Sequence, residues 1–424
     1  MNKNTLRAAY VAALMSTAAL AGAMTLTSPA ALAAGPTVGK AVGAQLQTAQ
    51  KAMQAGDWQG ALAATKAAQA VPDQNDYETY EINKFLSIEY INLKDMPNAT
   101  VAAEAAADSP GLQDEDKKDI YHNALLLAVQ AQQYQKAITY GQNLEKLGPL
   151  DDTLNAMMAV AYYNLKDTAN AQKYAQQSID ASKAAGKQPN QNALEIMMSS
   201  QAKTNQGAAQ ATLEQIAVNY NNPTDWGQLI DLALSTKGIR SADAIFLFRL
   251  RVLTGAMKNP EDYTLTGSIA EQLGYPTEAV NAYQAGINAG KITSAQAGAT
   301  FAKARTESAQ DQRALSGIAA AAEKSKTGEQ DVKLAEDYWG YGRYADVETA
   351  ARRAIAKGGL KNPQEGQMML GTALVAQGKY DEAQTTLAGV TSPPALAKAA
   401  HLWSLYAQAL QKKAGATQPA PATH

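Results

Sequence analysis

Cysteine is the residue that this sequence lacks altogether: none occurs in its 424 residues. This absence excludes disulfide bonds, a thiol nucleophile, an iron–sulfur cluster and a cysteine zinc site, and it also excludes a lipid-attached N-terminal cysteine. Histidine is nearly absent as well, because only His122, His401 and His424 occur and they lie far apart in the sequence. We therefore expect neither a metal site nor a bound cofactor.

Charge of one sign is not in excess either. The 37 lysine and arginine residues almost balance the 39 aspartate and glutamate residues, for a net charge of −2. Such a balance does not supply the basic surface that an electrostatic nucleic-acid binder needs. What is abundant is alanine, with 88 residues, and alanine at this level favours closely packed helices.

The N-terminus has the pattern of a secretory signal peptide. Lys3 and Arg7 precede an alanine-rich apolar stretch over 8–26, and Ala31-Leu32-Ala33 follows as a small-x-small cleavage pattern. We expect residues 1–34 to be removed by cleavage near Ala33 or Ala34, which places the mature protein in the periplasm or outside the cell. The alternative is an uncleaved anchor, because the stretch approaches the length that spans a bilayer. Residues 35–43 are expected to be a flexible leader.

A sequence pattern recurs along the rest of the chain. Near the C-terminus, Leu370-Gly371 is followed by Gly378-Lys379-Tyr380 and then by Ala383. The same order appears upstream, for example in Gly56-Asp57-Trp58 followed by Ala61. The pattern resembles the tetratricopeptide repeat, in which a glycine-containing turn joins two helices and an alanine opens the packed face of the second.

One alanine per copy, or a valine in its place, marks the second helix and sets the phase of the repeat. The spacing between successive markers averages about 36 residues, close to the period of about 34 in the family. The markers are Ala61, Ala99, Ala137, Ala171, Ala211, Ala242, Ala279, Ala314, Val347 and Ala383.

The resemblance implies an all-α fold: an α-solenoid, wound as a right-handed superhelix of about ten helix-turn-helix repeats over 44–394. The residue pattern favours the same class independently, because apolar residues recur at helical spacing and a lone helix pair cannot bury its apolar face without neighbours. We expect a C-terminal capping helix over 395–413 and a disordered tail over 414–424. The pattern is weakest over 290–330, which is the best candidate for a break between two halves.

Three short motifs together look like the signature of serine penicillin-binding enzymes. They are Ser200-Gln201-Ala202-Lys203, Tyr220-Asn221-Asn222 and Lys326-Thr327-Gly328. The last motif must lie on a strand edge to bind the substrate carboxylate, whereas here it falls between helical repeats. We therefore assign no catalytic residues.

The resemblance also implies a binding surface, since the first helices of such repeats line a concave groove that holds an extended peptide or a helix. Among its implied lining residues, Asn92 and Asn164 would hydrogen-bond the backbone of a ligand, and Tyr163 and Trp339 would be aromatic anchors. Lys84 also falls on this surface, but Ile88 follows where a carboxylate clamp would need asparagine. The implied groove residues are Asn92, His122, Tyr163, Asn164, Lys203, Asp231, Glu271, Trp339 and Met368.

These observations predict an exported, non-catalytic scaffold or adaptor that binds a protein or peptide partner, with no nucleic acid and no stable membrane insertion after signal cleavage. One alternative is a soluble subunit of a cell-envelope polysaccharide or outer-membrane assembly machine. The other is an envelope enzyme of the lytic-transglycosylase or penicillin-binding type, although the residues after the repeats are too few for the catalytic domain of a transglycosylase.

Overall fold

The computed structural model describes residues 37–417, and every regular element in that range is an α-helix. The predicted all-α class, built from stacked helix-turn-helix pairs, is confirmed. The predicted signal peptide lies outside the described residues. The helix contacts divide the chain into two units, with the boundary between residues 209 and 210.

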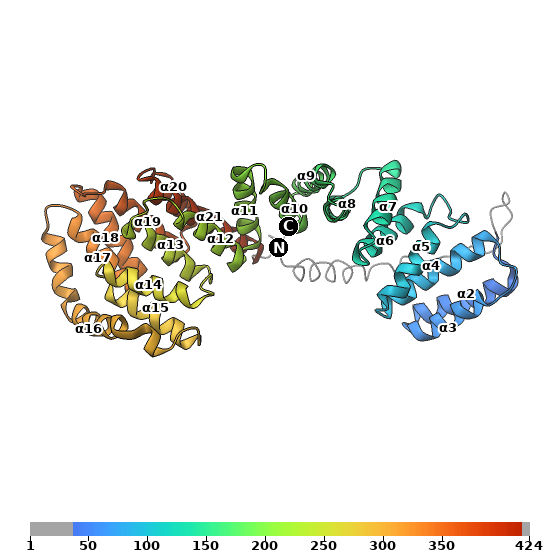
Figure 1. The fold of residues 1–424 in the computed structure, drawn as a ribbon, viewed down its shortest axis with the longest axis horizontal. Helices are drawn as coiled ribbons and strands as arrows, with labels where there is room; N and C mark the ends of the chain where they lie inside the picture. Colours follow the sequence, from blue (N-terminus) through green and yellow to red (C-terminus); the bar gives the residue numbers. More distant parts are fainter. Residues whose placement is uncertain (1–36, 418–424) are drawn as a thin grey trace, which may run out of the picture. The chain divides into compact units, whose positions relative to one another are not determined.

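Unit 1 is a stack of helix pairs in which each helix packs on its neighbours in chain order (Figure 1). Its helices are α2 (Lys40–Gln54), α3 (Trp58–Gln69), α4 (Asp76–Asn92), α5 (Met96–Ala107), α6 (Lys117–Gln130), α7 (Tyr134–Leu147), α8 (Asp152–Asn164), α9 (Thr168–Ala184) and α10 (Gln191–Gln201). The next helix, α11 (Gln206–Tyr220), contains the boundary between the units.

Unit 2 contains four more helix pairs, one long helix and a final helix. They are α12 (Pro223–Leu234), α13 (Ser241–Leu253), α14 (Pro260–Gln272), α15 (Pro276–Asn288), α16 (Ser294–Lys324), α17 (Glu329–Gly340), α18 (Tyr344–Lys357), α19 (Pro363–Ala376), α20 (Tyr380–Ala388) and α21 (Pro394–Thr417).

The turn inside a helix pair follows one rule in seven of the pairs. The residue two positions before the second helix has a left-handed backbone, which favours glycine because other side chains crowd the carbonyl oxygen there. Glycine occupies four of these positions, but lysine or glutamine occupies the other three. The seven residues are Gly56, Lys94, Gln132, Lys166, Gly274, Gly342 and Gly378.

The fourth residue of the second helix is small or β-branched and carries the repeat phase. Ala61, Ala137 and Ala383 occupy this position and are fully buried, so the helices approach closely where these residues lie. The same rule corrects two of the predicted markers. In α11 the fourth residue is Ala209 rather than the exposed Ala211, and in α13 it is Ala244 rather than Ala242.

The predicted repeat around Ala314 is wrong, because that stretch does not turn back to form a helix pair. It belongs to α16, whose only departure from helical geometry is a kink at Gly298, and Ala314 is exposed. The chain divides inside α11 and not within 290–330. The reason is that α16 packs on α15 before it and on α17 after it, which keeps it within unit 2.

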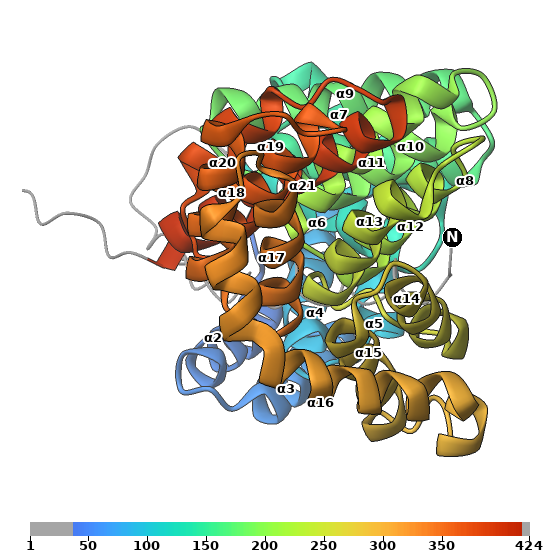
Figure 2. The ribbon, with the colours of Figure 1, turned by 90° about the vertical axis from the view of Figure 1, so that its left-hand side faces the viewer.

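The final helix closes unit 2 by packing on both ends of its helix sequence (Figure 2). α21 contacts α19 and α20, which precede it, and also α12 and α13, the first complete pair of the unit. The Trp403 indole N–H donates to the carbonyl oxygen of Phe246 at 2.8 Å, and the Tyr406 hydroxyl donates to that of Leu253 at 3.0 Å. Unit 2 is therefore closed on itself, where an open stack was expected.

Two predicted boundaries shift slightly. α2 begins at Lys40, inside the segment assigned to a flexible leader. α21 runs from Pro394 to Thr417 and so extends past both ends of the predicted capping helix.

Candidate functional site

Two of the predicted groove residues, Asn92 and Asn164, are the last residues of α4 and α8. Each side-chain amide donates to the carbonyl oxygen four residues earlier: Asn92 to Ile88 at 2.8 Å and Asn164 to Val160 at 2.8 Å. Each accepting carbonyl belongs to the same helix as the amide, in its last turn but one. Their shared position in the repeat is thus explained by helix structure before any ligand is considered.

His122 and Tyr163 remain partly exposed on α6 and α8, two first helices that contact each other. The His122 Nδ1 lies 3.4 Å from the Asn123 Oδ1, and the Lys166 ammonium lies 6.0 Å from the centre of the Tyr163 ring. These contacts are weak, so both side chains can still bind another molecule. We refer to Asn92, His122, Tyr163 and Asn164 as the first-helix surface of unit 1.

Two predicted lysines do not join this surface. Lys84 is neutralised within unit 1, because its ammonium lies 2.7 Å from Glu81 and 3.2 Å from Asp116. Lys203 is exposed in the turn that follows α10 and so does not lie on a first helix.

In unit 2, Asp231 and Glu271 are engaged in ion pairs. Asp231 pairs with Arg251 across the α12–α13 hairpin, and Glu271 pairs with Lys303 of α16. The Asp231 side chain is still 67% exposed, whereas that of Glu271 is 8% exposed. Glu271 thus links two helices and offers little surface to a ligand.

Met368 cannot line an accessible groove, which corrects the prediction for it, whereas Trp339 is nearly buried and lines a cavity of about 190 Å³ beside Arg249. Trp339 is 7% exposed and Met368 is 0% exposed. The Trp339 ring packs edge-on against Tyr344 and Trp403, with ring centres 5.0 Å and 5.9 Å apart. Helix α21 thus covers one side of the Trp339 ring through Trp403.

The interior of unit 2 contains an arginine that sequence reasoning missed. Arg249 is 2% exposed, and its guanidinium forms a two-pronged pair with Glu278, with N···O distances of 2.9 Å and 2.7 Å. The same group also donates to Glu336 and approaches the Met369 sulfur at 3.4 Å. One side chain of α13 thus holds α15, α17 and α19 together.

The charges around Arg249 stabilise its cationic form. Burial lowers the pKa of Arg249, but Glu278 and Glu336 raise it by more, so the group stays protonated. Burial raises the pKa of Glu336 although Arg249 opposes this effect. The only sequence signal of this network is the charged pair Arg249 and Arg251 inside the otherwise apolar run of 244–253.

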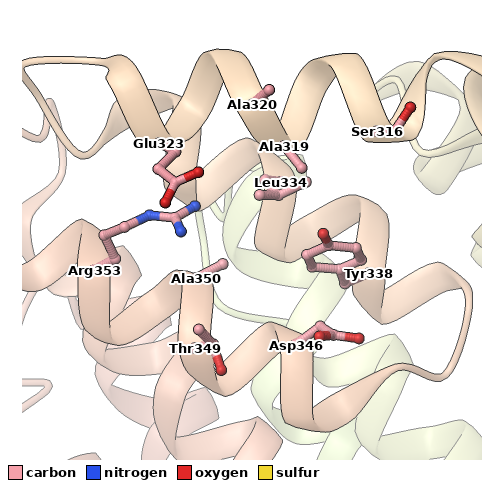
Figure 3. Close-up of a pocket in the computed structure, with 10 residues that line it drawn as sticks. All are labelled: Ser316, Ala319, Ala320, Glu323, Leu334, Tyr338, Asp346, Thr349, Ala350 and Arg353. Carbon is pink, nitrogen blue, oxygen red and sulfur yellow. The ribbon is translucent and has the colours of Figure 1, made fainter.

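A cavity of about 370 Å³ lies between α16 and the α17–α18 hairpin (Figure 3). Its middle is apolar, formed by Ala319, Leu334 and Ala350, and Glu323 and Arg353 face each other at one end. Ser316, Tyr338 and Asp346 lie at the other end, and Ala320 and Thr349 complete the lining. We refer to this space as the α16 cavity.

Two acidic side chains of α16 and α17 that do not line the α16 cavity have raised pKa values. Asp337 precedes Tyr338 on α17, and its pKa is raised to about 7, first by burial and then by Asp311 and Glu336, while Lys333 opposes the shift. Burial and Glu307 also raise the pKa of Asp311 on α16. The Asp346 carboxylate, by contrast, is paired with Arg343 at 2.7 Å.

The penicillin-binding-like motifs lack the local structure that such an enzyme site needs. Ser200 is buried on α10 of unit 1, while Lys326-Thr327-Gly328 lies in the turn between α16 and α17 of unit 2. A strand edge is needed there to bind a substrate carboxylate, and this stretch is not a strand.

Residues 37–417 lack two kinds of feature. No group of three or more histidine, aspartate or glutamate side chains in this range is arranged to hold a metal ion. Within the same range, no helix combines the length and the apolar character needed to cross a bilayer.

The model of the family described as "Tetratricopeptide repeat" matches residues 153–184, which cover most of α8 and all of α9. No curated protein matches this chain.

Among the solved structures that match the chain are the following three, whose TM-scores are too low to establish a common overall arrangement. A tetratricopeptide repeat protein from Parabacteroides merdae ATCC 43184 is 10% identical, with a TM-score of 0.28, and the match covers 87% of this chain and 99% of that one. The structure of Naa15/Naa10 bound to HypK-THB is 11% identical, with a TM-score of 0.25, and the match covers 88% of this chain and 73% of that one. The tetratricopeptide repeat domain of P58(IPK) is 11% identical, with a TM-score of 0.22, and the match covers 88% of this chain and 99% of that one.

The family match and the structure agree on one part of the chain. Residues 153–184 fold into a helix pair with a left-handed turn residue at Lys166 and a fully buried alanine at Ala171. The chain is therefore built from stacked helix pairs, and its α8–α9 pair matches the model of the tetratricopeptide repeat.

Proposed function

We propose that this protein is an exported, non-catalytic scaffold that binds a protein partner through the first-helix surface of unit 1. The observation that supports the proposal is the contrast between the two units. In unit 2, the predicted groove residue Trp339 and its neighbours Trp403 and Arg249 are buried. In unit 1, His122 and Tyr163 on neighbouring first helices remain partly exposed and make only weak contacts.

The physical basis is the usual one for helical repeats. Stacked helix pairs present a preformed, rigid surface, so a partner that binds there loses little free energy in ordering the scaffold. Partly exposed aromatic side chains such as Tyr163 are the residue type that contributes most to binding energy at protein interfaces.

The test is recovery of partners from a cell-envelope extract with the full mature chain as bait. Tyr163→Ala and His122→Ala should each lower the recovery of the specific partner, because they remove contact area from the proposed surface. Gln176→Ala is the matched control, because Gln176 is exposed on α9, the second helix of the same pair. Unchanged recovery with both surface variants would show that the partner binds elsewhere.

Export is part of the proposal and rests on the N-terminal pattern of Lys3, Arg7 and Ala31-Leu32-Ala33. It is tested by determining the N-terminus of the protein isolated from its native cell and by fractionating that cell. We expect a chain that begins at Ala34 or Gly35 in the periplasmic or secreted fraction. A full-length chain in the cytoplasm would contradict export while leaving partner binding open to its own test.

A soluble subunit of an envelope assembly machine is a narrower form of the same proposal, distinguished by which partner is recovered. No geometric observation favours it over a general scaffold.

A further inference from the structure

The cavity beside Arg249 lies inside unit 2 and has a volume of about 190 Å³. Its walls come from α13, α14, α15, α17 and the start of α18. Two of its lining residues, Thr266 and Trp339, are buried, whereas Asn281 and Gly342 are exposed. The cavity is therefore open to solvent on one side and closed on the other. We refer to it as the Trp339 cavity.

The charges of the Trp339 cavity are already paired. Among the residues that line it, only Arg249 and Glu278 are charged, and they bond to each other with N···O distances of 2.9 Å and 2.7 Å. A charged ligand would lose its hydration there without gaining an unpaired counterion, which costs free energy. The cavity therefore favours an uncharged ligand.

Two buried hydroxyl groups of the lining are bonded within the protein as well. The Tyr263 hydroxyl donates to the carbonyl oxygen of Met257 at 3.0 Å, and the Thr266 hydroxyl donates to that of Asp262 at 2.6 Å. Neither hydroxyl needs a ligand as its hydrogen-bond acceptor. Apolar side chains such as Leu253 form much of the remaining surface, so most of the ligand should be apolar.

The Trp339 indole N–H is the exception, because it has no hydrogen-bond partner within the part of the chain that the structure describes. The other two buried tryptophans follow the usual rule that a buried indole finds an acceptor: Trp226 donates to the Asn221 Oδ1 at 2.8 Å, and Trp403 donates to the Phe246 carbonyl oxygen at 2.8 Å. The Trp339 nitrogen is also not completely enclosed by protein atoms, and the open space beside Trp339 is this cavity. A ligand oxygen would supply the missing acceptor.

The size and the walls of the Trp339 cavity favour a single aromatic ring. An engineered apolar cavity of about 150 Å³ binds benzene, and the Trp339 cavity is somewhat larger. Tyr263, Trp339 and Tyr344 line it, and aromatic side chains attract further rings beyond the effect of buried area. The Trp339 ring is held in place, because Arg249 lies 5.1 Å from its centre and Tyr344 packs edge-on at 5.0 Å. The site is thus preformed, which favours binding.

We propose that the Trp339 cavity binds an uncharged phenol, whose ring packs among the aromatic side chains and whose oxygen accepts from the Trp339 indole N–H. A phenol combines one ring with one oxygen and is uncharged at neutral pH. Two sources offer this chemistry: a free phenolic compound and the tyrosine side chain of a partner. The inference goes beyond the proposed function, because it assigns a ligand to unit 2 and does not require the first-helix surface of unit 1.

The probes are p-cresol, which reproduces the side chain of tyrosine, toluene, which lacks the oxygen, and p-toluate, which is anionic. Binding of each to the full mature chain is measured by isothermal titration calorimetry at neutral pH. We expect p-cresol to bind and toluene to bind about tenfold more weakly, because toluene cannot accept from Trp339. We expect p-toluate to bind more weakly than p-cresol, because its charge finds no free counterion.

N-acetyltyrosinamide separates the two sources, because it carries the same phenol on a peptide backbone. Binding at least as strong as that of p-cresol indicates the tyrosine of a partner. Weaker binding indicates a free phenolic compound, since the backbone then does not pass the opening of the cavity.

Two variants locate the site. Trp339→Phe removes the N–H and keeps an aromatic ring, so it should weaken p-cresol binding by about tenfold and leave toluene binding nearly unchanged. Ala285→Phe fills the cavity from an exposed position on α15 and should abolish the binding of both probes. Ala289→Phe, just after the end of α15, is the matched control, because Ala289 is exposed and does not line the cavity. Circular dichroism verifies that each variant retains its helices.

Three results would overturn the proposal: no binding of p-cresol, equal binding of p-cresol and p-toluate, or p-cresol binding that Ala285→Phe leaves unchanged. These outcomes are separable from the scaffold test. If Tyr163→Ala abolishes partner recovery while p-cresol fails to bind, the proposed function stands and this inference falls.

Discussion

At the residue scale, several polar side chains of this protein are buried with incomplete partners. Glu89 is the clearest case in unit 1. It is 0% exposed in the last turn of α4, and the Thr65 hydroxyl donates to one of its carboxylate oxygens at 2.6 Å. The other oxygen has no hydrogen-bond partner. Burial without a cation disfavours the charged form, and it raises the pKa of Glu89 to about 7, an effect that the Thr65 bond opposes.

This raised pKa makes the stability of unit 1 depend on pH. The folded state holds the proton more tightly than the unfolded state, whose value is 4.5. The contribution of protonated Glu89 to the free energy of unfolding is therefore complete below pH 4.5, and it is lost as the pH rises through about 7. Glu89→Gln cannot ionise, so it should remove this loss and stabilise the protein at pH 8 by up to about 3 kcal/mol.

The free energy of unfolding of α4 and its neighbours is measured at pH 4.5 and at pH 8, by hydrogen exchange in increasing concentrations of urea. Glu115→Gln is the control, because Glu115 is an exposed acid of the same unit and its removal should leave the pH dependence as it is. A Glu89→Gln protein with the pH dependence of the wild type would show that Glu89 is not the group responsible.

At the element scale, the helix pairs depend on small residues where two helices meet. In α19, a Cβ atom added to Gly371 would lie 2.5 Å from the Leu387 side chain of α20. At Gly317 in α16, an added Cβ atom would meet nothing within 4 Å. Both glycines lie inside helices, so replacing each with alanine changes the helix propensity in the same way. A difference between the two variants therefore reports the packing against Leu387.

The two glycine-to-alanine substitutions should change the free energy of unfolding in opposite directions. Gly371→Ala should destabilise unit 2 by about 1–3 kcal/mol through overpacking, reduced by the better helix propensity of alanine. Gly317→Ala should stabilise α16 by roughly 0.5–1 kcal/mol, because only the propensity changes. Thermal unfolding followed by circular dichroism measures both. Destabilisation of similar size in both variants would mean that the α19–α20 contact is not the cause.

At the scale of the whole molecule, unit 2 depends on contacts between segments far apart in the sequence. Trp403 of α21 is 0% exposed and bonds to Phe246, 157 residues earlier. Arg249 joins α13 to α19 across 120 residues. A purely sequential stack has only contacts between neighbouring repeats, so removal of one helix of unit 2 should affect several others.

Trp403→Ala tests this dependence. We expect the loss of a fully buried indole and its hydrogen bond to destabilise unit 2 by about 3–5 kcal/mol. Hydrogen exchange should become faster in α12, α13 and α21 and stay unchanged in α4 to α7 of unit 1. Lys398→Ala is the control on the same helix, because Lys398 is exposed and surface changes usually have small effects. An equal increase in exchange in both units would contradict the division of the chain into two units.

The same distinction of scales explains which parts of the fold and of the candidate site could be predicted. The repeat pattern was predictable because its signals are local: a left-handed turn residue such as Gly378 and a buried alanine such as Ala383 lie within one helix pair. The markers Ala211 and Ala242 were misplaced by two residues because several alanines occur near each position. The groove was predicted less well, because exposure depends on what covers a residue, and the residues that cover Trp339 come from α13 and α21.

The sequence by itself therefore determined the all-helical class, the pairing of neighbouring helices and the phase of most repeats, since helix propensity, turn conformation and apolar spacing act over a few residues. Only the tertiary structure decided that α21 closes unit 2, that Arg249 is buried between two carboxylates, and that α16 leaves a cavity beside α17 and α18. These features depend on contacts between residues separated by up to 193 positions. Local preferences do not specify such contacts, because the free energy of burial depends on which distant surfaces come together.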